Sequence, residues 1–327
     1  MYHNNNGKSK EDVKMSENVK IGQSDVISTP LGFGTNAVGG HNLFPNLDEQ
    51  VGMDSVRAAL DSGITMLDTA FAYGFGRSEE LIGKVLKDYD RSKVVIATKG
   101  AQIVNGDKVS ISNQPADLEK FVKSSLERLG TDYLDIFYIH FPDKQTPKDE
   151  AINKLVDLKK QGLIKAIGVS NFSLDQLKEA NKNHDVDIVE DQYSLVHRDA
   201  EKELFPYLEK ENISFVPFFP LASGLLTGKY DGSPVNFPDD DLRSDDPNFS
   251  GSRFHAITES VKNLQPIADN HDATIAQIVL AWYIKNPDIS VVIPGAKTAE
   301  QVRSNAKAMN VALSDEEYNT IDNAFRI

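Results

Sequence analysis

The sequence DIFYIH at residues 135–140 joins a short apolar run to a polar residue, and this pattern recurs along the chain. The other runs lie at residues 32–34, 65–67, 94–97, 166–169, 188–189, 214–216 and 291–293. Near-continuous apolar runs of this length are typical of strands in a parallel sheet that is buried on both faces. The sequence therefore predicts eight parallel strands.

Amphipathic helical patterns separate these runs. In one of them the apolar residues recur at spacings of three and four, at Leu118, Phe121, Val122, Leu126 and Leu129. Gly130 ends that pattern, and residues 173–176 and 314–317 match capping boxes at helix starts. Eight alternating strands and helices predict an α/β fold, a (β/α)8 TIM barrel in a single domain with a C-terminal helical extension.

An open doubly wound sheet is the alternative arrangement. That fold usually carries a G-x-G-x-x-G turn after its first strand, and Gly32-Phe33-Gly34 lacks the third glycine at this spacing. The chain has 327 residues, and α/β barrels run to about 250 residues or more as one domain. Both observations favour the barrel.

Composition excludes several classes of function. The chain has 35 Lys and Arg against 49 Asp and Glu, a net charge of −14, which argues against nucleic-acid and anionic-membrane partners. Cysteine is absent and the seven histidines show no i, i+4 pair, so we expect neither disulfides nor a metal site. No apolar run reaches the roughly 20 residues of a membrane-spanning helix, and no signal peptide is visible. We expect a cytoplasmic protein that is a monomer or a weak homo-oligomer.

Two segments depart from the regular repeat. Residues 1–20 are polar and are interpreted as a flexible leader, which leaves residues 21–327 for the barrel. Residues 231–253 carry three Pro, two Gly and six Asp, and we interpret them as a long polar insertion after the seventh strand.

Polar residues follow four different strand runs. Asp68, Lys99, His140 and the pair Ser170–Asn171 stand at these ends, and Tyr73 follows Asp68 by five residues. The C-terminal ends of barrel strands carry the active site, and charged groups beside apolar runs are costly unless they are paired. We therefore expect these side chains to form one site.

The same residue types indicate proton transfer. A tyrosine with a pKa near ~10 is a poor acid or base at neutral pH until a cation stabilises its phenolate. Lys99 can supply that cation and lower the pKa of Tyr73, Asp68 can keep Lys99 charged, and His140 can orient a substrate oxygen. Such a group protonates a carbonyl oxygen as hydride arrives, and the hydride requires a cofactor.

Seven motifs, in this order, resemble the aldo-keto reductase family over nearly the whole chain from about Val19. They are LDTAFAYG at 67–74, ATKG at 97–100, DIFYIHFPD at 135–143, GVSNFS at 168–173, DQYSL at 191–195, FFPLASGLLTGKY at 218–230 and VIPGAKTAEQVRSN at 292–305. The long form of the last two segments is similar to bacterial reductases near the potassium-channel β-subunit branch.

The resemblance implies roles for particular residues. The catalytic tetrad is Asp68, Tyr73, Lys99 and His140, with Tyr73 as the general acid or base. Ser170, Asn171 and Gln192 match the residues that bind the nicotinamide carboxamide, and Phe218 matches the aromatic residue that stacks on the ring. Leu221, Ser223, Gly224, Leu226 and Lys229 match the pyrophosphate loop. Gly295, Lys297, Gln301 and Asn305 match the adenosine end, and Gly34 and Thr35 complete the cofactor-binding set.

The adenosine segment also carries a physical signal of its own. Residues 298–301 match a capping box, so a helix begins directly after Lys297. A helix N-terminus beside an ammonium group suits an anion such as the 2′-phosphate of NADP. Gln301 departs from the arginine of many relatives, but Lys297 still favours NADP(H) as the cofactor.

The resemblance implies an NADPH-dependent oxidoreductase that reduces a small-molecule carbonyl substrate, an aldehyde or a ketone. The substrate site is expected to be lined by residues 42–44, Phe75, Phe141 and the 231–253 insertion. Phe219 stands where the family commonly has a small residue, and we expect it to narrow the substrate site. One alternative is a cofactor-bound regulatory or partner subunit, as in potassium-channel β-subunits. Another is a Schiff-base aldolase that uses Lys99.

Overall fold

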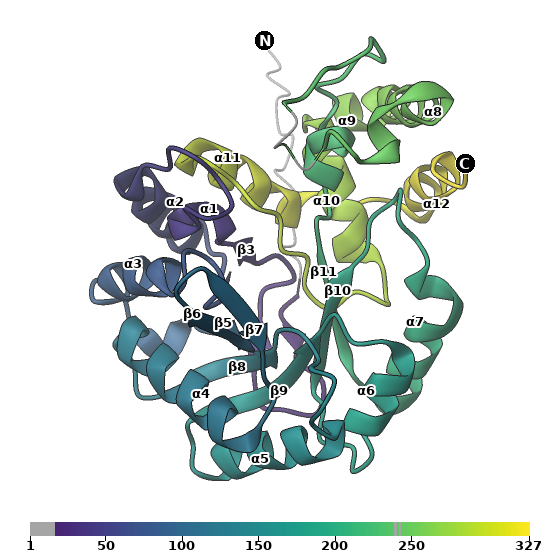
Figure 1. Cartoon of the computed structure of the whole chain (residues 1–327). Helices are drawn as coiled ribbons and strands as arrows, with labels where there is room; N and C mark the ends of the chain where they lie inside the picture. The colour runs from purple at the N-terminus through teal and green to yellow at the C-terminus, as the bar shows by residue number, and fades with distance from the viewer. Residues whose placement is uncertain (1–16, 239–240, 242) are drawn as a thin grey trace, which may run out of the picture.

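Seven parallel strands form a nearly closed barrel in the computed structural model, which describes residues 17–238, 241 and 243–327 (Figure 1). The strands are β3 Phe33–Gly34, β4 Met66–Asp68, β5 Val95–Gly100, β8 Leu134–Ile139, β9 Ile164–Ser170, β10 Ile188–Gln192 and β11 Ser214–Phe218. They pair in the order β11-β10-β9-β8-β5-β4-β3. The predicted barrel is confirmed.

The gap between β11 and β3 is closed by the eighth predicted run. This run, residues 291–293, and Gly295 just after it form isolated parallel bridges, Leu31 with Val292 and Gly34 with Gly295, instead of a continuous strand. Gly32 N donates to Val292 O over 2.8 Å. Pro294 follows directly and has no N–H for a ladder, which accounts for the interruption.

Helices surround the barrel on its outside (Figure 1). They are α1 Asn36–Gly39, α2 Glu49–Asp61, α3 Arg77–Leu86, α4 Pro115–Leu129, α5 Lys148–Lys160, α6 Leu174–Ala180, α7 Ala200–Glu211, α8 Gly251–Lys262, α9 Gln265–Asn270, α10 Ile275–Lys285, α11 Ala299–Ala306 and α12 Asp315–Ala324. The capping boxes of Ser173 and Ser314 are present, and Gly130 ends α4 at φ +64°. Among the described residues no helix is long and apolar enough to cross a membrane.

A short antiparallel hairpin closes the N-terminal end of the barrel. Its strands are β1 Val19–Lys20 and β2 Ile27–Ser28, and Ile21 and Val26 pack into the apolar cluster that fills the barrel. Of the leader expected over residues 1–20, residues 1–16 lie outside the described residues, whereas Val19 and Lys20 already pair with β2.

The described part of the polar insertion packs through aromatic rings. The rings belong to Tyr230, Phe237, Phe249 and Phe254, and neighbouring centroids lie 5.3–6.2 Å apart. Asp241 and Arg243 form an ion pair within it, and the short helix η3 Pro247–Phe249 leads into α8. The segment is therefore folded against α8 over most of the part that the structure describes.

Strand alternation places the polar residues at one end of the barrel interior. Val95 and Ala97 fill the interior of the barrel, and Lys99 is the next inward position on β5. On β10 the inward residue Ile188 is followed in the same way by Glu190. Because side chains on one face of a strand recur every second residue, the interior is apolar below and polar at its C-terminal end.

Gly168 leaves space for the Tyr138 ring, which lies beneath the polar residues Lys99 and Glu190. It lies opposite Tyr138 in the β8–β9 pairing, and a Cβ at Gly168 would lie 2.3 Å from Tyr138 Cδ1. We therefore expect Gly168→Ala to lower the free energy of unfolding by about 1–3 kcal/mol, the usual cost of overpacking. Urea denaturation measures this, and an unchanged midpoint would show that the ring has room to move.

Candidate active site

Lys99 lies at the centre of a buried polar cluster. Its Nζ is 2.5 Å from Asp68 Oδ1, 3.1 Å from the carbonyl oxygen of Thr69 and 3.2 Å from Glu190 Oε2. The side chains of Lys99, Asp68 and Glu190 are 1%, 2% and 3% exposed. These residues come from three strands, β5, β4 and β10, so closure of the barrel brings them together.

The charge on Lys99 is fixed by its neighbours. Burial disfavours the ammonium group, but the carboxyls of Asp68 and Glu190 outweigh it and raise the pKa of Lys99 above its usual range. A Schiff base forms from a neutral amine, which requires a lowered lysine pKa. This environment therefore argues against the aldolase alternative.

Tyr73 lies above Lys99, on the turn that leaves β4. The Lys99 Nζ is 5.6 Å from the centroid of the Tyr73 ring. The turn continues through Gly74 at φ +68°, where a Cβ would lie only 2.0 Å from the carbonyl oxygen of Gly39. Backbone of this kind suits glycine alone, so Gly74 allows the turn to approach α1 closely.

The expected lowering of the Tyr73 pKa is wrong. Desolvation raises the pKa of Tyr73 above its usual range, and the Asp68 and Glu190 carboxyls add to this, although Lys99 acts in the opposite direction. The main reason is burial of the hydroxyl, and the two acids beside Lys99 further offset the effect of its charge. Tyr73 is consequently a neutral phenol, which is the form that donates a proton.

The ring of His140 lies beside the ring of Tyr73. The two ring centroids lie 6.5 Å apart with the planes perpendicular. Burial and the charge of Lys99 lower the pKa of His140 to about 3, so the ring is neutral at physiological pH. Gln102 Nε2 lies 3.2 Å from His140 Nδ1, and with the amide donating there, Nε2 carries the ring proton and can donate to a substrate oxygen.

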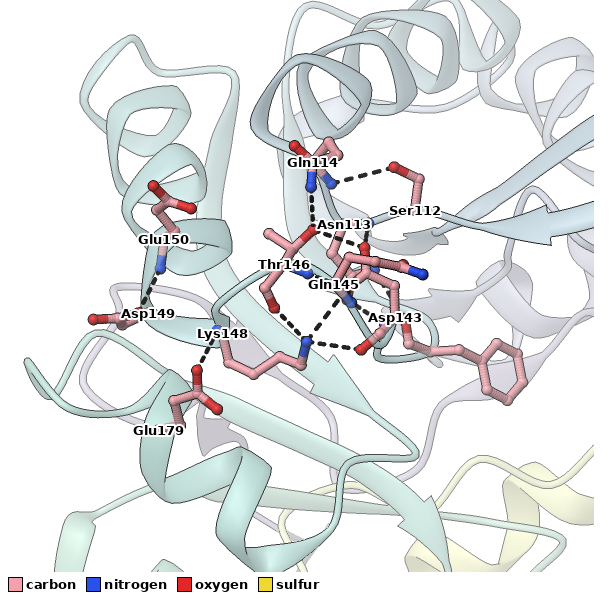
Figure 2. Close-up of polar contacts among 11 residues, drawn as sticks. Ser112, Asn113, Gln114, Asp143, Gln145, Thr146, Lys148, Asp149, Glu150 and Glu179 are labelled. Carbon is pink, nitrogen blue, oxygen red and sulfur yellow. Dashed lines mark hydrogen bonds and ion pairs between the residues drawn. The ribbon is translucent and has the colours of Figure 1, made fainter.

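A buried network holds the loop that follows His140 (Figure 2). Lys148 Nζ donates to the carbonyl oxygens of Asp143 and Thr146, and the Asp143 carboxylate accepts from the N–H of Asn113 at 2.7 Å. Asn113 also donates to the carbonyl oxygen of Phe141. The ring of Phe141 stacks on His140 at 4.5 Å, so this network fixes one wall of the site.

Glu190 is a site residue that the sequence analysis missed. The apolar run at residues 188–189 and the motif that follows it point to Gln192, but Gln192 is exposed at the end of β10 while Glu190 is buried beside Lys99. The signal was available, because Glu190 follows Ile188 at the two-residue spacing of an inward face.

At two pairs of residues, backbone or an ammonium group is free of bulky side chains and can contact a cofactor closely. Gly34 bridges Gly295 at the closing edge of the barrel, and both are glycines, so backbone rather than side chains lines that edge. A Cβ at Gly224 would lie 2.5 Å from Lys229 Nζ, which places that ammonium directly over a left-handed turn. A cation above backbone of this kind suits a pyrophosphate, and the residues present fit a dinucleotide.

Some of the remaining residues predicted to bind the cofactor lie at the barrel mouth, whereas others support the structure around it. Asn171 donates to the carbonyl oxygen of His140 and to Ser170 Oγ, both over 3.0 Å, and Phe218 is half-buried above the apolar cluster inside the barrel. By contrast, Thr35 Oγ1 donates to the Asp68 carbonyl oxygen and thereby positions Asp68. Leu226 is buried in the outer core, so its side chain supports the loop.

At the adenosine segment the helix start differs from the expected capping box. Thr298 Oγ1 accepts from the Gln301 N–H, but Gln301 Oε1 accepts from the N–H of Lys297 instead of Thr298. Lys297 is exposed, and its Nζ lies 5.2 Å from the Phe44 ring centroid. Its charge also contributes to lowering the pKa of Asp241, whose largest cause is the Arg243 hydrogen bond. Ser223 is exposed, whereas Leu221 and Asn305 are half-buried.

Three exposed phenylalanines follow strands at the mouth of the barrel. Phe75, Phe141 and Phe219 follow β4, β8 and β11, and they are 43%, 37% and 45% exposed. Phe75 and Phe219 also have positive φ angles, +52° and +55°, which are rare and strained for bulky residues. Strain that keeps an apolar ring in solvent is typical of a binding surface.

Comparisons with known proteins agree on one family. The model of the Aldo/keto reductase family matches residues 30–326. The NADH-specific methylglyoxal reductase of Escherichia coli K12 is 33% identical, over 91% of this chain and 94% of its own. A glycerol dehydrogenase structure from Gluconobacter oxydans superposes with a TM-score of 0.87 at 32% identity, covering 94% and 95% of the two chains. An aldo-keto reductase from Klebsiella pneumoniae in complex with NADPH gives a TM-score of 0.72 at 26% identity, covering 95% of each.

Proposed function

The chain belongs to the aldo/keto reductase family, and from this premise we propose that it is an NADPH-dependent oxidoreductase that reduces aldehydes or ketones to alcohols. The observation that carries the proposal is the buried ammonium of Lys99, held by Asp68 beneath the neutral phenol of Tyr73. This arrangement supplies an acid with a cation behind it, at the end of the barrel where active sites lie.

Each residue has a defined task in the reaction. The nicotinamide cofactor, when bound, supplies a hydride to the carbonyl carbon. The Nε2–H of His140 holds the carbonyl oxygen, and the Tyr73 hydroxyl donates its proton to that oxygen. Lys99 stabilises the phenolate that remains on Tyr73, and Asp68 keeps Lys99 protonated and in place. In the reverse direction the same phenolate accepts the alcohol proton.

Two groups of residues support cofactor binding. Lys229 over Gly224 suits the pyrophosphate, and the half-buried Phe218 offers a ring surface at the barrel mouth. Lys297 beside the start of α11 supports a preference for NADP, because a helix N-terminus and a cation both attract the 2′-phosphate. Asp241 near Lys297 opposes that preference.

A substrate panel tests the activity. Aldehydes, ketones and the corresponding alcohols are assayed with NADPH and with NADH, following absorbance of the reduced cofactor. Turnover of carbonyl compounds with NADPH is expected. Tight NADPH binding without turnover of any carbonyl compound would instead support a regulatory or partner subunit.

Lys297→Ala is expected to weaken NADPH binding selectively. A charge-assisted hydrogen bond contributes roughly 1.5–3 kcal/mol, which corresponds to about 10- to 150-fold in affinity at ~1.4 kcal/mol per decade. NADH has a hydroxyl at the 2′ position, so its affinity should stay almost unchanged. Fluorescence titration of both cofactors measures the two effects.

A matched control is available on the same part of the chain. Lys307 is an exposed lysine just beyond the other end of α11, and Lys307→Ala should leave both affinities unchanged. Added salt should weaken NADPH binding to the wild type more than to the Lys297 variant, because salt screens the ion pair. Equal losses for the two cofactors would contradict the preference for NADP.

A further inference from the structure

Two buried carboxyls share one ammonium in the site. Asp68 Oδ1 lies 2.5 Å and Glu190 Oε2 lies 3.2 Å from Lys99 Nζ. Asp68 Oδ2 has no hydrogen-bond partner among the described residues, and Glu190 Oε2 has its ion pair with Lys99 but no hydrogen bond of good geometry. Buried polar atoms without partners are rare in proteins, so a donor is missing from this arrangement.

In the part of the chain that the structure describes, Lys99 is the cation beside Glu190, and no second one lies there. The charged or titratable groups that face Glu190 are Asp68 on β4, Lys99 on β5, Tyr138 on β8 and Tyr73 above β4. Its partners in register on β9 and β11 are Ser170 and Val216, which carry no charge. Two ionised acids beside one ammonium would leave a net negative charge in a buried site, which is costly.

One proton shared by the two acids removes this cost. Burial and the nearby Asp68 carboxyl raise the pKa of Glu190 well above its usual value, and a hydrogen bond between the two carboxyls favours the proton on Glu190. Burial raises the pKa of Asp68 overall. The charge of Lys99 and the hydrogen bond with Glu190 both lower the pKa of Asp68, so they favour its ionised form. Neighbouring acids that cannot both ionise behave in this way.

We propose that Glu190 is a protonated positioning residue, which donates a hydrogen bond to Asp68 and leaves Lys99 with a single negative counter-charge. Only one carboxylate then offsets the positive charge of Lys99, so Lys99 stabilises the Tyr73 phenolate more than it would between two carboxylates. The consequence for Tyr73 rests on the proposed function, whereas the protonation of Glu190 does not.

Infrared difference spectroscopy of the full chain tests the protonation without any turnover. At neutral pH the wild type should show a protonated-carboxyl C=O band that is lost in Glu190→Gln. The same band should be lost in Asp68→Asn, because Glu190 then becomes the sole counter-ion of Lys99 and ionises. Labelling the glutamate carboxyls with ¹³C should shift this band, whereas labelling the aspartates should not.

Glu211→Gln is the control for the spectra. Glu211 pairs with Lys210 and His184 at the surface, and its pKa is lowered, so this substitution should leave the protonated-carboxyl region unchanged. The proposal is overturned if Glu190→Gln removes no band, or if the band shifts with labelled aspartate alone.

The pH profile of alcohol oxidation tests the effect on Tyr73. Glutamine keeps a neutral hydrogen-bond donor at every pH, whereas Glu190 loses its proton at alkaline pH and then opposes ionisation of Tyr73. The rising limb of kcat/KM should therefore continue to higher pH in Glu190→Gln than in the wild type. One like charge moves a neighbouring pKa by about one to three units, so a difference of about tenfold or more is expected in the alkaline range.

The two experiments separate the possible failures. Loss of the infrared band in Glu190→Gln with no carbonyl turnover in any form of the protein would reject the proposed function and retain the shared proton. Normal turnover with superimposable pH profiles would reject the role of Glu190 in positioning Lys99 for Tyr73.

Discussion

Replacing Tyr73 by phenylalanine is expected to lower carbonyl turnover by about 10²–10⁴-fold, the contribution of a general acid. The substitution removes one hydroxyl from a ring whose centroid lies 5.6 Å from Lys99 Nζ and whose plane is perpendicular to the His140 ring. In the proposed reaction this hydroxyl acts on the substrate oxygen, so NADPH affinity should be nearly intact. Steady-state kinetics and fluorescence titration of the cofactor measure the two quantities separately.

Tyr89→Phe provides a matched control for this prediction. Its hydroxyl donates to Asp61 on the outside of the barrel, between helices that do not contribute to the site, so turnover should stay close to that of the wild type. A Tyr73→Phe variant with turnover within about threefold of the wild type would reject Tyr73 as the acid.

The barrel and much of the site follow from strand alternation, which the sequence displays directly. The residues Val95, Ala97 and Lys99 are spaced two apart, so an apolar interior predicts that Lys99 points into the same space. The same rule applies to Tyr138 on β8 and to His140, which directly follows that strand. Because parallel strands end on one side of the barrel, the sequence places Lys99, His140 and Asp68 together without knowledge of any distance.

The position of Glu190 in the site does not follow from the sequence pattern alone. The run at residues 188–189 is only two residues long, so it does not define where the strand ends, and the motif around Gln192 points to the next inward position on the strand. The exposure of Gln192 and the burial of Glu190 depend on how far β10 extends into the barrel mouth, which only the pairing with β9 and β11 defines.

The sign of the Tyr73 pKa shift could not be predicted from the motif. Lys99 alone would lower this pKa, but the outcome depends on desolvation and on the number of acids that share the lysine. The partner of the Gln301 side chain was likewise open, because its oxygen reaches the N–H of Lys297 as easily as that of Thr298. Both properties arise from distances of a few ångströms in the assembled fold.

Lys99→Met is expected to abolish most activity, because the phenolate of Tyr73 loses the only cation that lowers its pKa in the described site. In the oxidation direction the pKa of the rate profile should move upward or vanish with the activity. An unchanged profile with normal rates would mean that Lys99 has a structural role only. Lys93→Met, at an exposed lysine before β5, is the control and should leave the profile unchanged.

The same substitution should make stability depend on pH more steeply. Burial raises the pKa values of Asp68 and Glu190 in the folded chain, and Lys99 opposes this rise at Asp68, the ionised partner in the proposed pair. Without Lys99 the folded chain can keep a proton on Asp68 as well as on Glu190, whereas the unfolded chain releases both above the ordinary pKa values of 3.8 and 4.5. Without Lys99 the folded chain keeps about one proton more than the wild type, so the variant should lose about 1.4 kcal/mol more for each pH unit above about 4. Urea denaturation between pH 5 and pH 8 measures the free energy of unfolding of both proteins. Parallel curves would show that Lys99 does not hold the charge of either carboxyl, because only a change in bound protons can make the curves diverge.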